Sequence, residues 1–490
     1  MGNRLTFFMA ALLLYFFGFN QTVLADNITV RKVLQKIRSY YKQQNQTTHP
    51  VQNPVPPPTP APNNPTQPSE RTPFGLHAAG SGTEAKDIGA SIVRKMLRWG
   101  DAEPAKGSYQ TELMDKSIKQ TADHGLSIVV SLVAASPWGT NPAALQSKCG
   151  SYTCTGIPTD HEAWKNFIRT IVERYDGDGN QDMPGLKHPI KYWQIENEWL
   201  AQWKNSAEDY LAHLKETSET VKQADPEAKI ILAGATARLI AAADGYWQNN
   251  TVQTGTSDAD LKVLSVDEYI HKAKNSPRYK TAKQKLELIF SQGHPYFDIV
   301  DFHTYGEPEE IVASANFIKD LMHKNGYAKP IWSLEAAAPF FNFTEEKFTE
   351  DVIKLYQLGL GSGVEKIFWS SLVPTLAWNE NFLRLALIDT NKRKTSAYYA
   401  YKLAAEKLKG YRSTELVNSG ANVRVFKNTT ETGEVYVGWS TTGQFENITL
   451  PFPNAKQVKV TNSRATVNLV SVTNGSVALS LSSPVFIEPA

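Results

Sequence analysis

Two stretches of the sequence end an apolar, strand-like run abruptly with chargeable side chains. Tyr192–Ile195 is followed by the tripeptide Glu-Asn-Glu at 196–198, and Pro330–Leu334 is followed by Glu335. A buried strand has no packing reason to end in carboxylates, although an acidic surface loop would also read this way. Two carboxylates brought together from different strands can act as a proton donor and a nucleophile.

The region 72–410 has the rhythm of a scaffold that could bring such side chains together, because short apolar runs alternate with amphipathic segments. Strands are predicted at Pro73–His77, Ile92–Leu97, Ser127–Val133, Tyr192–Ile195, Lys229–Ala233, Ile299–His303, Pro330–Leu334 and Lys366–Trp369. Helices are predicted at Leu113–His124, His161–Tyr175, Ala207–Ala224, Glu309–Asn325, Glu346–Leu360 and Ser396–Leu408. Eight such units in roughly 340 residues predict an α/β fold, the (β/α)8 TIM barrel. A doubly wound sheet is the alternative, but no Gly-rich phosphate turn follows the first strand.

The pattern changes beyond Gly410, where only strand-like segments separated by Gly and Asn turns remain. Strands are predicted at Val423–Phe426, Glu434–Trp439, Glu446–Leu450, Gln457–Thr461, Thr466–Val472, Ser476–Ser480 and Val485–Glu488. Residues 411–490 are therefore predicted to form a C-terminal β-sandwich domain, which could bind sugar or support the barrel.

In a barrel, residues at the carboxyl ends of different strands converge on one bowl. Glu198 from the fourth strand and Glu335 from the seventh would face each other across its mouth. Carboxyl groups about 5–5.5 Å apart, one a nucleophile and one a proton donor, are what retaining glycoside hydrolysis requires. The other strand ends supply candidate substrate-binding residues, which are Arg94, Asn197, His303, Tyr305 and Trp369.

Over the barrel, the sequence resembles the clan A glycoside hydrolases, since Asn197-Glu198 ends the fourth strand and Glu335 the seventh. Further matching pieces are the segment 99–109, His303-x-Tyr305 and Phe368-Trp369. Families 39 and 5 are most similar, the former partly because of the appended sandwich, and the tripeptide at 196–198 is also similar to family 35 β-galactosidases. The third strand lacks the His that family 5 often shows there.

The resemblance implies a retaining hydrolase of β-linked glycans or glycosides, with Glu198 as acid/base and Glu335 as nucleophile. Glu198 must begin protonated, which the negative charge of Glu335 favours, and it acts as a base once the glycosyl-enzyme has formed. Asn197 would hold the 2-hydroxyl of the sugar, and Trp369 would form the floor of its subsite. Neither a cofactor nor a metal ion is expected.

Several of these residues have a second interpretation. Arg94 would lower the pKa of Glu335, or it could be a structural ion-pair residue. Tyr305 is placed to hydrogen-bond Glu335, whereas His303 could equally be a core histidine. The two acidic residues of the tripeptide at 196–198 alternate along a strand, so spacing alone leaves their roles open, and the resemblance favours Glu198. Tryptophans beyond the strand ends could stack on sugar or pack in loops: Trp138, Trp199, Trp203, Trp247 and Trp378.

The N-terminal residues predict export. Arg4, the apolar run 7–19 and the small-residue site ending at Ala25 are typical of a signal peptide over 1–25, and the run is too short to span a membrane. Residues 26–71 are a polar segment and a Pro-rich linker without a core of its own. In the secreted or periplasmic location that follows, Cys149 and Cys154 are expected to form a disulfide.

The loop Asp176–Asp182 spaces oxygen ligands as a calcium loop does, but Gln181 stands where the loop needs Gly, and Lys187 where it needs a bidentate Glu. It also falls on the side of the barrel opposite the bowl. An Asx-type turn is the favoured interpretation, and calcium binding is the open alternative.

The charge balance, 51 Lys+Arg against 49 Asp+Glu, argues against nucleic acid as a partner and fits a carbohydrate substrate. Two non-enzymatic alternatives remain. A non-catalytic glycan-binding protein on a barrel fold would be marked by loss of Glu198 or Glu335, and both are present. A secreted scaffold, in which the Pro-rich arm and the sandwich carry the function, predicts no turnover of any glycoside.

Overall fold

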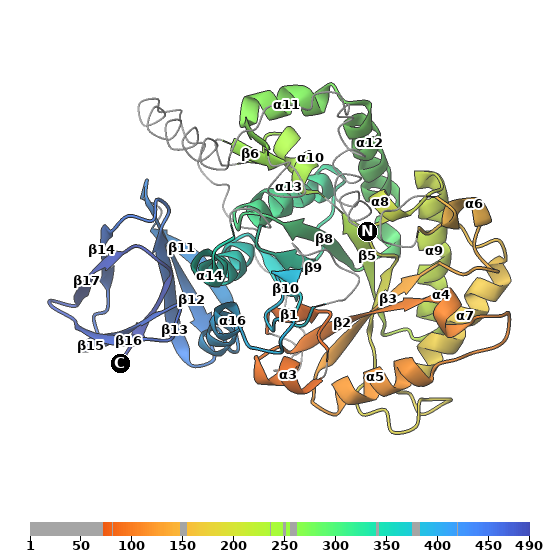
Figure 1. Cartoon of the computed structure of the whole chain (residues 1–490), viewed down its shortest axis with the longest axis horizontal. Coiled ribbons are helices and arrows are strands. Elements are labelled where there is room, and N and C mark those ends of the chain that lie inside the picture. The colour runs from red at the N-terminus through yellow and green to blue at the C-terminus, as the bar shows by residue number, and fades with distance from the viewer. Residues whose placement is uncertain are drawn as a thin grey trace.

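The computed structural model describes residues 72–80, 82–147, 154–235, 237–247, 251–254, 262–339, 343–374, 383–418 and 420–490. Within them, a closed barrel of eight parallel strands is ringed by helices and followed by an antiparallel β region at the C-terminus (Figure 1). The predicted fold class, a (β/α)8 barrel with a C-terminal β-sandwich, is confirmed. The predicted signal peptide and linker lie outside the described residues.

The barrel strands are β1 (Phe74–His77), β2 (Ile92–Arg98), β3 (Ser127–Val133), β4 (Tyr192–Ile195), β5 (Lys229–Ala235), β8 (Ile299–Tyr305), β9 (Ile331–Ala337) and β10 (Val364–Ser370). They pair in the order β1-β10-β9-β8-β5-β4-β3-β2, which closes the sheet on itself. Each coincides with one of the eight predicted strands. Several extend further at the carboxyl end than predicted, because polar site residues interrupt the apolar pattern there.

The helices around the barrel are α3 (Gly82–Asp87), α4 (Trp99–Ala102), α5 (Glu112–Ala122), α6 (Pro142–Leu145), α7 (His161–Tyr175), α8 (Trp199–Gln202), α9 (Ala207–Ala224), α13 (Glu310–Lys324), α14 (Glu345–Gly361) and α16 (Ser396–Lys407). The start of α7 is fixed by Asp160, whose side chain accepts the Ala163 N–H, and α9 begins with a capping box between Ser206 and Asp209. No helix in the described part of the chain has the length and hydropathy of a membrane-spanning segment.

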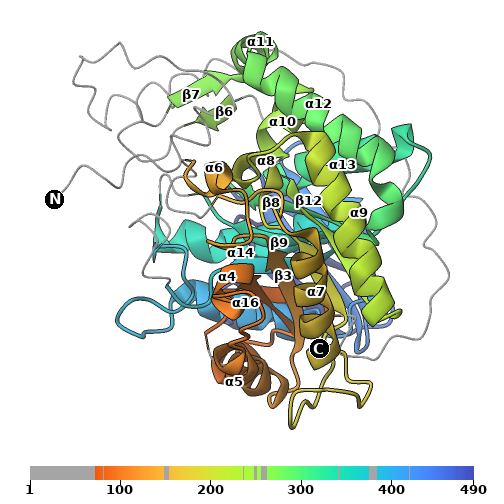
Figure 2. The same ribbon diagram turned by 90° about the vertical axis from the view of Figure 1, so that its right-hand side faces the viewer.

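An insertion between β5 and β8 adds elements that the sequence pattern did not predict. They are α10 (Arg238–Ala243), the hairpin of β6 (Thr251–Thr254) and β7 (Lys262–Ser265), α11 (Val266–Lys274), α12 (Pro277–Gln292) and the 3-10 turn η3 (His294–Tyr296). Figure 2 shows them gathered on one side of the molecule, beside α9 and α13. The insertion breaks the β/α alternation on which the prediction depended.

The interior of the barrel is layered, because every second residue of a strand points inward. The apolar layer consists of Ile92, Val129, Tyr192, Ile231, Ile299, Trp332, Leu334 and Phe368. Two residues further along four of these strands, the inward side chains become polar, namely Arg94, Ser131, Gln194 and Asp301. The apolar layer is thus the floor on which the polar residues of the barrel mouth stand.

The C-terminal region contains a six-stranded antiparallel sheet, in the order β11-β12-β13-β18-β15-β16, and a two-stranded ribbon, β14-β17. Its strands are β11 (Ser413–Asn418), β12 (Val423–Thr430), β13 (Gly433–Ser440), β14 (Glu446–Pro451), β15 (Gln457–Asn462), β16 (Val467–Ser471), β17 (Ser476–Leu481) and β18 (Val485–Pro489). Seven of these were predicted. Strand β11 was not, since it is an edge strand whose residues are mostly exposed and show no buried alternation.

The six-stranded sheet packs against the barrel through α14 and α16. Phe426, Trp439 and Phe486 belong to the same apolar cluster as the barrel core. The closeness of the packing requires Gly361 at the end of α14, where an added Cβ would lie 2.7 Å from the Phe426 ring. At the centre, Gln357 of α14 and Asn428 of β12 are both buried and exchange two hydrogen bonds, of 3.2 and 2.9 Å.

The Gln357–Asn428 amide pair should stabilise barrel and sandwich as one unit. We expect Gln357→Ala to lower the free energy of unfolding by about 1–3 kcal/mol, because it leaves the buried Asn428 Oδ1 without its donor. Chemical denaturation followed by tryptophan fluorescence measures this, with the exposed Leu113→Ala as a control near zero. A Gln357→Ala protein as stable as wild type would contradict the assigned role of the pair.

Candidate active site

A single arginine organises the polar layer at the barrel mouth. The Arg94 side chain, on β2, is fully buried. Its Nε donates to Ser131 Oγ (2.8 Å) and its Nη1 to Glu335 Oε1 (2.6 Å). Its Nη2 donates to Gln194 Oε1 (2.6 Å) and to Asn197 Oδ1 (2.5 Å). The guanidinium of one β2 residue is therefore hydrogen-bonded to β3, to β9, to β4 and to the residue Asn197 just beyond β4.

Glu335 reaches the bowl because β9 holds one extra residue. The register pairs Asp301 with Trp332 and His303 with Glu335, so three steps along β9 match two along β8. Trp332 and Leu334 point inward, so strict alternation would turn Glu335 outward. The bulge reverses the alternation, and Glu335 also points inward. The Leu334 N–H at this irregularity donates to Asp301 Oδ1 at 2.7 Å.

The environment of Glu335 favours its ionised form. Its side chain is 8% exposed, and burial by itself would raise its pKa. The positive charges of His303 and Arg94, together with the Tyr305 hydroxyl that donates to Oε2 at 2.6 Å, outweigh burial and hold the pKa well below its usual range. A carboxylate that stays ionised is what a nucleophile needs.

His303 is a cation at neutral pH. Burial by itself would lower its pKa, but the charges of Glu335 and Asp301, with hydrogen bonds to Asp301 and Glu198, raise the pKa to about 10. The imidazolium donates from Nδ1 to Glu198 Oε1 (2.9 Å) and from Nε2 to Asp301 Oδ2 (3.1 Å). Gly234 on β5 leaves room for the ring, since a Cβ there would lie 2.5 Å from Nε2.

Just beyond the end of β4, Asn197 and Glu198 point into the bowl and Glu196 points away from it. Glu196 has a φ of +71°, which breaks the alternation of the strand. Its carboxylate accepts the Ala134 N–H (2.9 Å) and lies 3.1 Å from His213 Nε2, on the outer side of the strand. Of the two acidic residues in the tripeptide, Glu198 is therefore the one in the bowl.

The two candidate catalytic carboxylates lie close together. One atom each of Glu198, Glu335 and His303 lie within 4.8 Å of one another. This distance joins one oxygen of each carboxylate, so both side chains can contact the same small group in the bowl. The same three side chains each offer one ligand atom to a metal ion, whereas the Arg94 guanidinium beside Glu335 disfavours a divalent cation there.

Four site residues were not singled out from the sequence: His77, Ser131, Gln194 and Asp301. Gln194 accepts from Arg94 and from Ser131 and donates to Asp301 at 2.7 Å, so it connects the two cations through one amide. His77 Nε2 lies 3.8 Å from Glu335 Oε1, and burial lowers its pKa to about 4, so the ring is neutral at pH 7. The sequence feature that could have identified these four residues is a polar side chain within an otherwise apolar strand.

Trp369 does not take the place predicted for it. Phe368 belongs to the inward apolar layer, so the next side chain along β10 faces the helices instead. The Trp369 side chain is fully buried, packs against Phe348 of α14 and donates its N–H to the Leu385 carbonyl at 3.0 Å. The prediction that it floors a sugar subsite is wrong, because no face of the ring is accessible.

The other predicted features fall as follows. Trp199 and Trp203 are buried in the helical shell, Trp138 and Trp247 are half-buried, and Trp378 lies outside the described residues. Cys149 also lies outside them, so its disulfide with Cys154 stays a prediction.

In the acidic loop after α7, the Asp182 carboxylate accepts the N–H groups of Gly177 (3.0 Å) and Gly179 (2.8 Å). Asp178 likewise accepts the Asn180 N–H at 2.7 Å. These are the bonds of an Asx-type turn, the interpretation that the sequence favoured.

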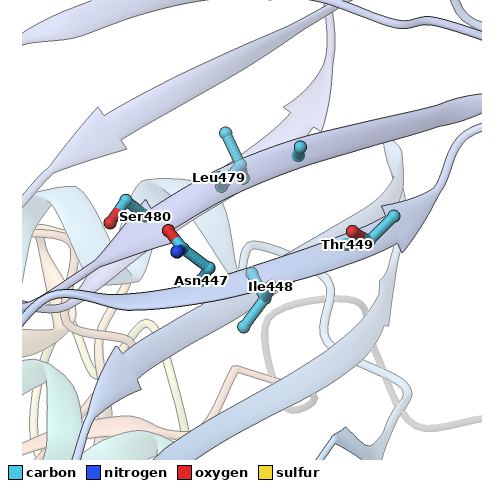
Figure 3. A pocket seen from close by; sticks show the side chains of 6 residues that line it. Asn447, Ile448, Thr449, Leu479 and Ser480 are labelled. Carbon is cyan, nitrogen blue, oxygen red and sulfur yellow. The ribbon is translucent and has the colours of Figure 1, made fainter.

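A shallow pocket on the sandwich is a second place where a ligand could bind (Figure 3). It lies on the β14-β17 ribbon and is lined by Asn447, Ile448, Thr449, Ala478, Leu479 and Ser480. None of these side chains titrates or offers an aromatic face, so the pocket has no catalytic chemistry. The barrel mouth is the better candidate.

Solved structures with the same fold include several glycoside hydrolases. A family 39 glycoside hydrolase from Bacteroides cellulosilyticus WH2 has a TM-score of 0.62 at 16% identity, over 86% of this chain and 82% of that one. A family 30 endoxylanase from Clostridium papyrosolvens C71 has 0.54 at 15% identity, over 86% and 96%. A family 51 α-L-arabinofuranosidase from Bifidobacterium longum has 0.52 at 12% identity, over 86% and 95%. No protein-family model and no curated protein matches the sequence.

At these identities the likenesses show the fold alone. They extend the clan A resemblance from the sequence motifs to the barrel, and the coverage of 86% of the chain is too large for the barrel alone to account for. The chain thus has the fold of clan A glycoside hydrolases.

The raised pKa of His303 predicts how stability depends on pH. The folded state holds the proton more tightly than the unfolded chain, so the stabilisation is fully present below pH 6.5 and is lost as pH rises towards about 10. The stability difference between wild type and His303→Gln should therefore shrink over this window, by at most about 1.4 kcal/mol per pH unit. Urea titrations of both proteins from pH 6 to 10 measure it, and a difference that grows with pH would contradict the cationic His303.

Proposed function

We propose that the protein is a secreted retaining glycoside hydrolase that cleaves β-linked glycans or glycosides. The observation that carries the proposal is the pair of carboxylates at the carboxyl end of β4 and on β9, with one oxygen of each within 4.8 Å of the other. Glu335 is held ionised by Arg94, His303 and Tyr305. Glu198 accepts from His303 through Oε1 and is 12% exposed, so its carboxyl group can reach a substrate.

In the first step, Glu335 attacks the anomeric carbon while Glu198, protonated at the outset, gives its proton to the departing oxygen. The bond from the anomeric carbon to that oxygen breaks as the bond to the Glu335 carboxylate forms. Arg94 and Tyr305 orient the nucleophile, one on each of its oxygens. Asn197, which accepts a hydrogen bond from Arg94, would hold the 2-hydroxyl.

In the second step, water attacks the glycosyl-enzyme, Glu198 takes the proton, and Glu335 leaves with both electrons of its bond to the sugar. Neutralisation of Glu335 in the intermediate removes a negative charge next to Glu198, which then ionises more readily and acts as a base. None of these steps needs a cofactor.

The structural neighbours support this chemistry and leave a choice of sugars. They include a family 39 glycoside hydrolase, a glucosidase, an endoxylanase and an α-L-arabinofuranosidase. The N-terminal sequence supports export. The substrate screen should therefore include aryl glycosides of glucose, xylose, mannose, galactose and arabinofuranose, beside a panel of polysaccharides.

Glu335→Gln should abolish turnover of whichever substrate the wild type hydrolyses, with kcat reduced by at least about 1000-fold, because the amide cannot form the glycosyl-enzyme. Glu365→Gln on β10 is the matched control, since that side chain is outside the bowl and should leave kcat unchanged. Wild-type rates in Glu335→Gln would refute the nucleophile. Silence of wild type on every substrate would favour the non-catalytic glycan-binding protein.

Glu198→Ala should separate the two steps. Substrates with poor leaving groups should lose about 100- to 10,000-fold in rate, whereas dinitrophenyl glycosides should still form the glycosyl-enzyme. Added azide should restore turnover and give the β-glycosyl azide, which proton NMR identifies. An equal loss on both classes of leaving group, or an α-azide, would exclude Glu198 as the acid/base of a retaining enzyme.

A further inference from the structure

We propose that Glu196 and His213 form a positioning pair that sets the direction of Asn197 and Glu198, the residues that follow in the chain. This inference rests on the proposed function and adds to it two residues that do not touch the bowl. Both are almost fully buried, on the side of β4 that faces α9.

The backbone at Glu196 is in a conformation that L-residues rarely adopt. A φ of +71° disfavours any side chain with a Cβ, by roughly 1–2 kcal/mol. Glycine would remove this strain, so the presence of glutamate indicates that its side chain has a task at this point.

The Glu196 carboxylate replaces a backbone carbonyl as a hydrogen-bond acceptor. Ala134 is the first residue beyond β3, and its N–H donates to Glu196 Oε1 rather than to a carbonyl of the neighbouring strand. The Glu196 N–H donates to the Leu132 carbonyl at 2.9 Å, so both the backbone and the side chain of Glu196 are hydrogen-bonded to the end of β3. These two bonds hold the turn of the chain at Glu196, after which Asn197 and Glu198 both enter the bowl.

His213 fixes the carboxylate from the other side. Its Nε2 lies 3.1 Å from the same Oε1, and its ring is held between Trp164 and Trp203, with centroids 5.3 and 5.0 Å away. Among the described residues, Glu196 Oε2 and His213 Nδ1 have no hydrogen-bond partner. A buried pair that leaves two polar atoms unsatisfied contributes little to stability, so a role in stability alone does not explain it.

The pair acts on catalysis through Glu198, and this separates positioning from stability. If Glu198 is displaced, proton donation suffers most when the leaving group is poor. A protein that is only less stable loses activity equally on all substrates.

We therefore expect Glu196→Ala to lose roughly 10- to 100-fold in kcat/KM on a phenyl glycoside and less than threefold in kcat/KM on the dinitrophenyl glycoside of the same sugar, because kcat/KM reports the first step, in which Glu198 is the acid. Glu196→Gln keeps an oxygen for both donors and should restore the wild-type dependence on the leaving group.

Two further variants complete the test. His213→Phe keeps the ring between the tryptophans but loses the N–H, so it should change the leaving-group dependence in the same direction, and it replaces Glu196→Ala if that protein does not fold. Gln357→Ala removes a partner from a buried polar pair far from the bowl and should leave the dependence unchanged.

A wild-type leaving-group dependence in both Glu196→Ala and His213→Phe would overturn the positioning role, while turnover by wild type and its loss in Glu335→Gln would leave the proposed function standing. If wild type and Glu335→Gln are equally inactive on all substrates, the proposed function itself has failed, and the positioning role with it.

Discussion

The barrel mouth depends on the burial of one guanidinium. Arg94 has no access to water, so its charge must be compensated by protein groups, and the compensation is the carboxylate of Glu335 with three neutral acceptors around it. This requirement binds the architecture to the chemistry. The proposed nucleophile, Glu335, is also the counter-ion of a buried cation, so its ionisation and the integrity of the polar layer depend on each other. A similar arrangement occurs on β8, the neighbour of β9, where the His303 cation lies between the carboxylates of Asp301 and Glu198.

Much of the fold could be predicted from local patterns. Eight apolar runs at β/α spacing gave the barrel strands because parallel strands buried on both faces are apolar along their length. The N-cap of α7 at Asp160 is likewise local chemistry. The exposed strand β11 escaped prediction because it shows no buried alternation. The insertion between β5 and β8 was also missed, although α12 buries Tyr279, Ala282, Leu286 and Ile289 at helical spacing.

The candidate site was predictable as a set of residues but not as a geometry. Glu198, Glu335, Arg94, His303 and Tyr305 come together as expected, since strand ends converge whatever the details. Strict alternation would have sent both acidic residues of the 196–198 tripeptide into the bowl. Trp369 was placed there only as a strand-end residue, whereas alternation puts it on the outer side because Phe368 points inward. Side-chain direction depends on single backbone irregularities, at Glu196 and within β9, and the residue types do not predict these irregularities. Gln194 and Asp301 were passed over for a related reason, since the apolar residues around them read as core.

The extra residue in β9 also limits what a gapless comparison of sequences can find. Trp332 and Glu335 point to the same side of the strand although three steps separate them, because three steps along β9 match two along β8. In a regular strand, the residue three steps after Trp332 would point to the outside of the barrel. An alignment of β9 with a regular strand therefore needs a one-residue gap between Trp332 and Glu335, since otherwise it pairs Glu335 with a residue of the opposite face. The number of residues along the strand thus carries information about the site as much as their identity does.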